Sequence, residues 1–293
     1  MALPVVASTS SNSAASATVV VTAPTGIAIG DLLIGSYTSF RTGGDTTNPA
    51  IPAGFTEIRK GRVQNDEGAV TAFFKVAVLA DVSAANYSFT SSLADHVHGA
   101  MMRITGAAVG SEITVSEVDL TLSGNGSTTV SWTGASTPLV GQSLAVMCVG
   151  GLDFSIASVV TTSGYNSTPT VTWTERADLG NRNGASDGAS HAVATAPYTG
   201  ATQFTQYGYN TSLVFASVVG ILFLVNAPQS VTPNVSHLNV APSLLGLAAT
   251  NTVSAPVSHL EIVPTINGMN TKLDNPLWTP QVKTATTWTP EIK

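Results

Sequence analysis

Two histidines separated by one residue form the arrangement in this chain that comes closest to a metal site. In Asp95-His96-Val97-His98 both imidazoles fall on one side of an extended strand, because side chains alternate between its two faces. Imidazole nitrogens bind zinc and similar metals, but a site needs further ligands. No cysteine and no close group of Asp, Glu or His completes such a set in the sequence. We therefore interpret the segment as the polar edge of a strand, and we predict no metal and no cofactor.

Nucleophilic catalysis has little support in the sequence. The single cysteine, Cys148, lies in the apolar run 144–149, so we expect a small buried hydrophobic residue. The chain contains no Gly-x-Ser-x-Gly elbow, His-Glu-x-x-His motif or phosphate-binding loop. Asp66 and Glu67 fall in a hairpin loop, and a glycosidase-like carboxylate pair from distant loops is the one enzymatic arrangement left open. We predict that the protein is not an enzyme.

The composition indicates a surface that is polar but carries few charges. Charged residues make up 10 % of the chain and hydrophobic residues 43 %, whereas an average soluble domain is about 25 % charged. The net charge of −6 and the scattered basic residues, with one cluster at 59–62, argue against nucleic-acid binding. The apolar run 213–225 is shorter than the roughly 20 residues of a membrane helix, so we predict a buried strand and no membrane insertion. Residues 1–6 lack the pattern of a secretory signal.

The elements that position these residues are short strands. Segments rich in Val, Ile, Thr and aromatic residues alternate with Gly, Pro, Asn and Asp. No run of ten or more residues shows a helical period. About a dozen such segments predict an all-β sandwich.

Segments of the first part of the chain return in the same order further along. The pairs are 30–37 with 141–147, 55–60 with 171–176, and 99–106 with 212–225. We predict two similar halves, 15–107 and 128–226, with a strand pair at 112–133 between them and a β-bulge near Glu117. Each half closes on an apolar strand that must be covered on both faces. We expect one jelly-roll-like β-sandwich over residues 1–228 rather than two domains, which the duplication also allows.

Residues 229–293 have a different character. Segment 235–242 returns 22 residues later as 257–264, and segment 278–283 returns ten residues later as 288–293. Repeats interrupted by proline do not build a core of their own. We predict an extended arm that binds partner subunits, the alternative being a tail that folds back on its own domain. The expected anchors of the arm are Val235, Leu238, Val257, Leu260, Trp278, Pro280, Val282, Trp288, Pro290 and Ile292.

Several motifs point to a known family. They are Gly-Asp-Leu-Leu (30–33), Pro-Ala-Gly-Phe-Thr (52–56), Phe-Lys-Val-Ala (74–77), Tyr-Ser-Phe-Thr (87–90) and Trp-Thr-Glu-Arg (173–176). In these the chain resembles, over about residues 15–226, a set of β-sandwich proteins of tailed bacteriophages and prophages that are minor tail or fibre-like virion proteins. The motifs carry no catalytic residues, and the segment after 229 departs from the pattern.

The resemblance implies a non-enzymatic virion protein assembled in the cytoplasm of a bacterial host. We expect it to be tail- or fibre-associated and to bind other virion proteins and copies of itself, as a homo-oligomer, through the arm. A capsid decoration or cement protein would use such an arm equally well. A third hypothesis is a lectin-like module in which loops 41–50 and 152–169 bind a host-surface glycan, with Phe154 and Tyr165 stacking on the sugar.

Overall fold

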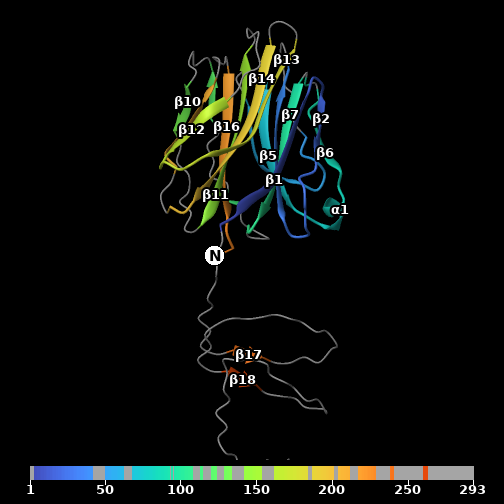
Figure 1. Ribbon diagram of the computed structural model, residues 1–293, viewed down its shortest axis with the longest axis vertical. Coiled ribbons are helices and arrows are strands. Elements are labelled where there is room, and N and C mark those ends of the chain that lie inside the picture. Colours follow the sequence, from blue (N-terminus) through green and yellow to red (C-terminus); the bar gives the residue numbers. More distant parts are fainter. Residues whose placement is uncertain are drawn as a thin grey trace, which may run out of the picture. The chain divides into compact units, whose positions relative to one another are not determined.

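In the computed structural model of the protein, the chain divides into two compact units, 1–229 and 230–293 (Figure 1). The first unit consists of strands with one four-residue helix among its described residues, α1 (Leu79–Val82), so the predicted all-β sandwich is confirmed. No helix in the described part is long and apolar enough to cross a membrane. The structure describes residues 3–41, 50–62, 68–92, 94, 96–107, 113–114, 120–123, 129–133, 142–153, 162–183, 187–200, 204–211, 217–228, 238–240 and 260–262.

The first half of the unit contains one large and one small antiparallel sheet. The large sheet has the strand order β1-β7-β3-β5-β4, and β2 pairs with β6 in the small sheet. The first strand thus lies beside the last and the second beside the penultimate, which is the pairing of a jelly roll. The strands are β1 (Val5–Ala14), β2 (Thr18–Thr22), β3 (Leu32–Phe40), β4 (Thr56–Arg62), β5 (Gly68–Val76), β6 (Asn86–Thr90) and β7 (His96–Thr105).

The second half repeats this order. Its large sheet runs β13-β14-β11-β16-β8, with β9 also pairing with β16, and its small sheet runs β10-β15-β12. Relative to the first half, β12 is an additional strand. The strands are β8 (Ile113–Thr114), β9 (Leu120–Ser123), β10 (Thr129–Thr133), β11 (Ser143–Asp153), β12 (Thr162–Thr168), β13 (Thr174–Asn183), β14 (Asp187–Tyr198), β15 (Gln206–Thr211) and β16 (Ser217–Asn226).

The repeated topology begins earlier in each half than the sequence pattern predicts. In the first half β1 occupies the edge beside β7, and in the second half β8 and β9 occupy the same position beside β16. The strands predicted between the halves are therefore the first strands of the second half. The likeness of the edge strands is hidden in sequence because β1 is a serine-rich strand with mostly exposed or half-buried positions. The bulge predicted near Glu117 lies outside the described residues.

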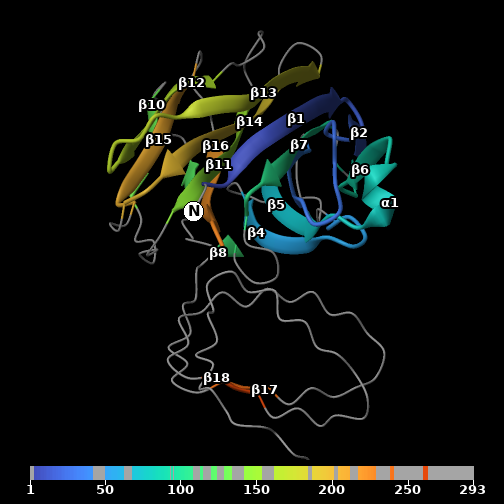
Figure 2. The same ribbon diagram turned by 60° about the horizontal axis from the view of Figure 1, so that its bottom comes forward.

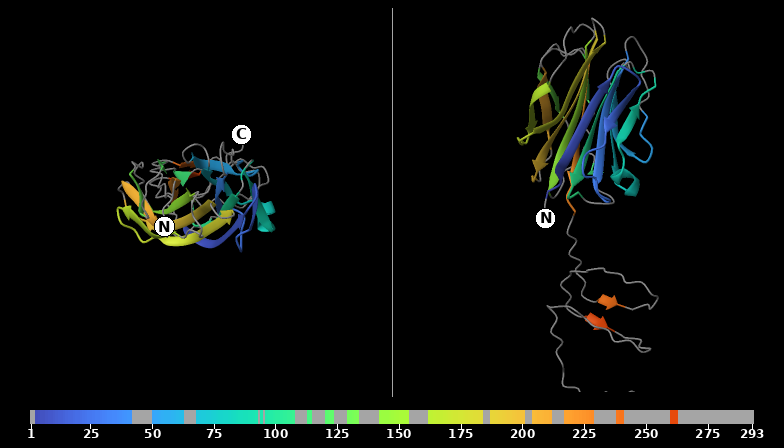
Figure 3. Two further views of the ribbon diagram at one scale, coloured as in Figure 1. Left: turned by 90° about the horizontal axis from the view of Figure 1, so that it is seen from above. Right: turned by 45° about the vertical axis from the view of Figure 1, so that its right-hand side comes forward.

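The sheets stack in four layers, with the two large sheets in the middle and a small sheet covering each outer face (Figures 2 and 3). The central core between the large sheets includes Ile34, Met102 and Phe223. The outer face of the second large sheet packs on the small sheet through residues such as Leu222. Each closing strand, β7 and β16, is thus covered on both faces, which explains the apolar runs that the sequence shows there.

Each half places a glycine of its closing strand beneath an aromatic ring of its small sheet. A Cβ on Gly99 of β7 would lie 2.5 Å from the Phe89 ring, and a Cβ on Gly220 of β16 would lie 2.8 Å from the Trp132 ring. Phe89 stacks on Tyr37 and Trp132 stacks on Tyr207. The two halves therefore share a packing arrangement as well as a strand order.

Candidate functional site

The two histidines of the predicted polar edge are inside the protein. His96 and His98 lie on β7 between β1 and β3, and they are 3 % and 0 % exposed. The polar-edge interpretation is therefore wrong. Both side chains point into the space between the two large sheets, because they alternate in phase with Met102 of the central core. There they meet a third histidine, His191 of β14, which sequence reasoning missed because it comes from the other half.

His191 is held by hydrogen bonds from both halves. Its Nδ1 lies 3.1 Å from the Val149 carbonyl oxygen and 2.6 Å from Thr38 Oγ1, and its Nε2 lies 2.8 Å from Ser36 Oγ. A carbonyl oxygen only accepts, so Nδ1 carries the proton and donates to Val149. The unprotonated Nε2 then accepts a hydrogen bond from the Ser36 hydroxyl.

A serine hydroxyl bonded to an imidazole is the pairing that activates a nucleophile in hydrolases. Ser36 is 1 % and His191 0 % exposed, however, and they sit between two packed sheets. A substrate has no access to a hydroxyl in that position. The hydrogen bond between Ser36 and His191 instead joins the two halves, so the role of this pair is structural.

Burial keeps His98 and His191 of this interior cluster neutral. It lowers the pKa of His98 to about 3, with a smaller contribution from the nearby His191 and His96. Burial also lowers the pKa of His191 to about 4, against the opposing effect of its hydrogen bonds with Val149 and Ser36. Cys148 is buried in the central core as expected, and burial raises the pKa of its thiol to about 12. A thiol in that state is a poor nucleophile.

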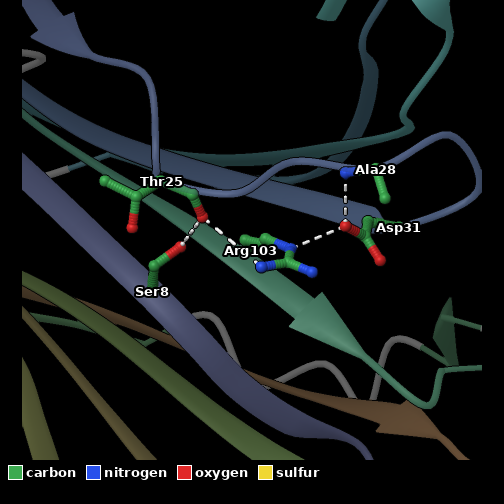
Figure 4. Close-up of polar contacts among 5 residues, drawn as sticks. All are labelled: Ser8, Thr25, Ala28, Asp31 and Arg103. Carbon is green, nitrogen blue, oxygen red and sulfur yellow. Dashed lines mark hydrogen bonds and ion pairs between the residues drawn. The ribbon is translucent and has the colours of Figure 1, made fainter. Parts of the chain in front are cut away.

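Two of the ion pairs found among the described residues stabilise the first half from largely buried positions. Arg103 of β7 lies between the Asp31 carboxylate and the Thr25 carbonyl, with Nε 2.6 Å from Asp31 Oδ2 (Figure 4). Asp31 also accepts a hydrogen bond from the Ala28 amide at 2.8 Å, and Ser8 of β1 donates to the Thr25 carbonyl oxygen. The group thus joins the turn before β3 to β1 and β7.

The second ion pair fixes α1. Lys75 Nζ lies 2.8 Å from Asp81 Oδ1 and 5.1 Å from the centroid of the Phe55 ring. The Val78 amide and the Tyr87 hydroxyl also donate to Asp81. Burial would raise the pKa of Asp81, but these hydrogen bonds and the Lys75 charge outweigh it, so the pKa is lowered.

A third polar group, on the second half, contains two carboxylates without a described cationic partner. Glu175 and Asp178 of β13 face Thr162 and Tyr165 of β12 and Tyr209 of β15. Burial and the Asp178 charge raise the pKa of Glu175, and burial raises the pKa of Asp178 against its hydrogen bonds with Thr162. Sequence reasoning missed the pair because a β-bulge brings the two side chains to one face.

No family model, curated protein or solved structure matches the chain. Within the described ranges no group of three or more His, Cys, Asp or Glu residues is arranged to hold a metal ion.

Of the predicted arm anchors, the structure describes the backbone of Leu238 and Leu260. Leu238 lies in β17 (Leu238–Val240) and Leu260 in β18 (Leu260–Ile262), and the two strands pair in parallel with Leu238 opposite Leu260. The pairing joins equivalent positions of the 22-residue repeat. The other anchors lie outside the described residues: Val235, Val257, Trp278, Pro280, Val282, Trp288, Pro290 and Ile292.

The loops of the lectin-like hypothesis are described only in part. Residues 42–49 and 154–161, including Phe154, lie outside the described ranges. Tyr165 is half-buried on β12, where its ring stacks on Tyr209 with centroids 6.2 Å apart. One face of the ring is thereby occupied by a neighbouring side chain. Hairpin residues Asp66 and Glu67 also lie outside the described part.

Proposed function

We propose that the protein is a non-enzymatic structural component of a bacteriophage virion, associated with the tail or a fibre. In this proposal the body, residues 1–229, is a rigid block, and the C-terminal unit binds copies of the chain or other virion proteins. The virion assignment rests on the family resemblance of residues 15–226, and the role of the C-terminal unit rests on one structural observation.

That observation is the parallel pairing of β17 with β18. Leu238, Asn239 and Val240 lie opposite Leu260, Glu261 and Ile262, so each residue faces its own counterpart in the sequence repeat. A motif that pairs in register with its own repeat can make the same main-chain hydrogen bonds with that motif in a second copy of the chain. Repeated pairing of this kind suits a segment that links subunits.

The side chains that are buried in the body also support the proposal. They include several of the types that serve in catalysis, namely Ser36, His98, His191 and Cys148. Only 10 % of the residues are charged. Burying such a surface against neighbouring subunits therefore removes few charges from water, which keeps the free-energy cost of desolvation low. Both features fit a building block better than a catalyst.

Truncation after Gln229 tests the proposal. The truncated and full-length chains are expressed in a host that produces particles lacking the protein, and its occupancy is measured by quantitative mass spectrometry of purified particles. We expect the truncated chain to fold, with an unchanged circular dichroism spectrum over the strand region, but to be missing from particles. Incorporation at full occupancy would show that the C-terminal unit is not the attachment element.

Labelled full-length protein on intact particles distinguishes the two virion locations. Gold label at the tail or fibres supports the proposal, whereas label distributed over the head would assign the protein to capsid decoration. Specific binding of the isolated body to a glycan array, together with absence from assembled particles, would favour the lectin-like hypothesis instead.

A further inference from the structure

A β-bulge brings two carboxylates to one face of β13. Glu175 pairs with Ala194 of β14 and Asp178 pairs with Ala192, and the register shifts between Glu175 and Ala177. Because Ala192 and Ala194 are two residues apart on β14, the two acidic side chains project from the same face of the sheet. This is the outer face of the large sheet, since Ala192 packs in the core that the small sheet covers.

The carboxylates meet hydroxyl groups from the small sheet. The Thr162 amide donates to Asp178 Oδ2 at 3.0 Å, and Thr162 Oγ1 lies 2.7 Å from the Tyr165 hydroxyl. Tyr165 also shares a hydrogen bond with the Glu175 carboxylate. Tyr209 is close enough for the Asp178 charge to raise the pKa of its hydroxyl, after the larger effect of burial. Oxygen atoms from β12, β13 and β15 thus converge on one place.

Two of these oxygens make no hydrogen bond with any described residue. Asp178 Oδ1 and the Tyr209 hydroxyl are buried, and neither has a hydrogen-bond partner among the described residues. Tyr209 is 0 % exposed, so water does not solvate its hydroxyl from outside. Buried polar atoms of folded proteins are rarely left in this state without a bound water, ion or ligand.

The charge of the pair is also uncompensated within the described residues. No ion pair there joins Glu175 or Asp178 to a lysine or arginine. The neighbouring Arg176 is turned elsewhere, because its Nε donates to Thr195 Oγ1 at 2.8 Å. Glu175 is exposed and Asp178 is half-buried, so the carboxylate pair lies at the boundary between solvent and the interior.

We propose that Glu175 and Asp178, together with the hydroxyls of Thr162 and Tyr165, form a Ca²⁺ site that joins β13 to the small sheet. The donors are all oxygens, which selects a hard cation over zinc or copper. Two carboxylates and neutral hydroxyls with remaining water ligands match the adaptable coordination of Ca²⁺ better than the strict octahedron of Mg²⁺. In this arrangement the Tyr209 hydroxyl, which has no partner among the described residues, donates to a water ligand of the ion.

The test measures Ca²⁺ binding to the full chain by isothermal titration calorimetry and by thermal unfolding. Asp178→Asn removes the buried ligand, Glu175→Gln removes the exposed one, and Glu57→Gln is the matched control on the edge strand β4. We expect Ca²⁺ to raise the melting temperature of wild type and E57Q by several degrees, because it binds only the folded state. Mg²⁺ should raise it less. D178N should weaken binding by more than about tenfold.

A spectroscopic probe locates the ion independently of stability. Tb³⁺ bound in the same site should emit when tyrosine is excited, because Tyr165 and Tyr209 lie beside it, and excess Ca²⁺ should quench that emission. E175Q should also reduce the Tb³⁺ emission. Because Glu175 is exposed, we expect this substitution to leave the fold intact. Three results would overturn the proposal: no heat of binding at millimolar Ca²⁺, an equal rise in melting temperature for D178N and wild type, or Tb³⁺ emission unchanged in both variants.

A shared proton is the competing way to satisfy the two carboxylates. In that case the calcium-free wild type would lose less stability than E175Q between pH 7 and pH 5, because protonation of the carboxyl pair offsets part of the loss caused by the buried histidines, and Ca²⁺ would have no effect at either pH. This combination would also overturn the proposal.

Discussion

Thr38 of the first half and His191 of the second are joined by a hydrogen bond of 2.6 Å across the interface between the two large sheets. The sheets approach closely at this point. A Cβ on Gly150, the residue after Val149, would come within 2.6 Å of Val70 and 2.7 Å of Thr38. Around Ile104 and Val225 the interface is an apolar core, whereas around Thr38 and His191 it is a buried polar cluster. The halves are therefore similar in topology but complementary in chemistry where they meet.

Ser36→Ala is expected to lower the free energy of unfolding. The substitution leaves Nε2 of His191 buried without its donor, which costs about 1–3 kcal/mol. Urea denaturation at pH 7.5 measures the loss. Ser88→Ala, at an exposed position of β6, is the control and should stay within about 0.5 kcal/mol of wild type. Equal effects of the two substitutions would contradict a bridging role for Ser36.

The buried histidines make stability depend on pH. The folded-state pKa values of His98 and His191 are about 3 and about 4, below the ordinary value of 6.5. At pH values below 6.5 but above the folded-state pKa values, these histidines bind protons in the unfolded chain and not in the folded chain. The free energy of unfolding therefore falls as pH decreases from 6.5 towards 4. With about 1.4 kcal/mol per pKa unit, the loss should amount to several kcal/mol.

Denaturation curves at a series of pH values check this slope. His98→Leu removes one titrating group and no hydrogen bond found among the described residues, so the variant should lose less stability than wild type on acidification. The comparison is repeated in proteins that also carry E175Q and D178N. These substitutions remove two carboxyl groups with raised pKa values, whose effect on the pH dependence of stability has the opposite sign. An identical slope for H98L and wild type would mean that His98 is not held neutral in the fold.

Gly99→Ala and Gly220→Ala should both destabilise the body, because each new methyl group collides with a ring of the small sheet. Overpacking of this kind costs about 1–3 kcal/mol. Thermal unfolding of the single variants measures the cost. Combining G220A with Trp132→Phe, whose smaller ring gives the methyl group room, should recover part of it. Strictly additive losses in the double variant would argue against contact between the two positions.

Asp31→Ala is expected to cost more than removal of a surface ion pair, which is typically worth less than about 1 kcal/mol. The Asp31 and Arg103 side chains are 14 % and 20 % exposed, and Asp31 also holds the Ala28 amide. A double-mutant cycle with Arg103→Ala separates the pair from the turn. We expect a coupling energy of about 1 kcal/mol or more at low salt, and a value near zero would show that the carboxylate acts through the turn alone.

Sequence periodicity was sufficient to predict features set by local pattern. The apolar run at 213–225 indicated a buried strand, and β16 (Ser217–Asn226) is covered on both faces. The return of segments 30–37 and 55–60 at 141–147 and 171–176 predicts a duplication, and the two large sheets have corresponding strand orders.

What could not be predicted depends on contacts between distant segments. His96 and His98 look like a polar strand edge until His191 of the other half is placed opposite them. Glu175 and Asp178 are three positions apart, a spacing that puts side chains on opposite faces of a regular strand. Only the bulge between Glu175 and Ala177 reverses that, and its sequence, Glu-Arg-Ala, carries no signal for it.

Proline substitutions in β17 and β18 test whether the paired repeat motifs carry subunit association. Asn239→Pro and Glu261→Pro each remove a backbone amide and block a strand conformation that continues through the residue. Because the chain forms two separate compact units, 1–229 and 230–293, we expect the melting temperature of the body to be unchanged. Association of the full chain, measured by analytical ultracentrifugation, should weaken in each variant and most in the double variant. Thr271→Pro, outside both segments of the 22-residue repeat, is the control. Undiminished association of the double variant would show that subunits do not contact each other through these motifs.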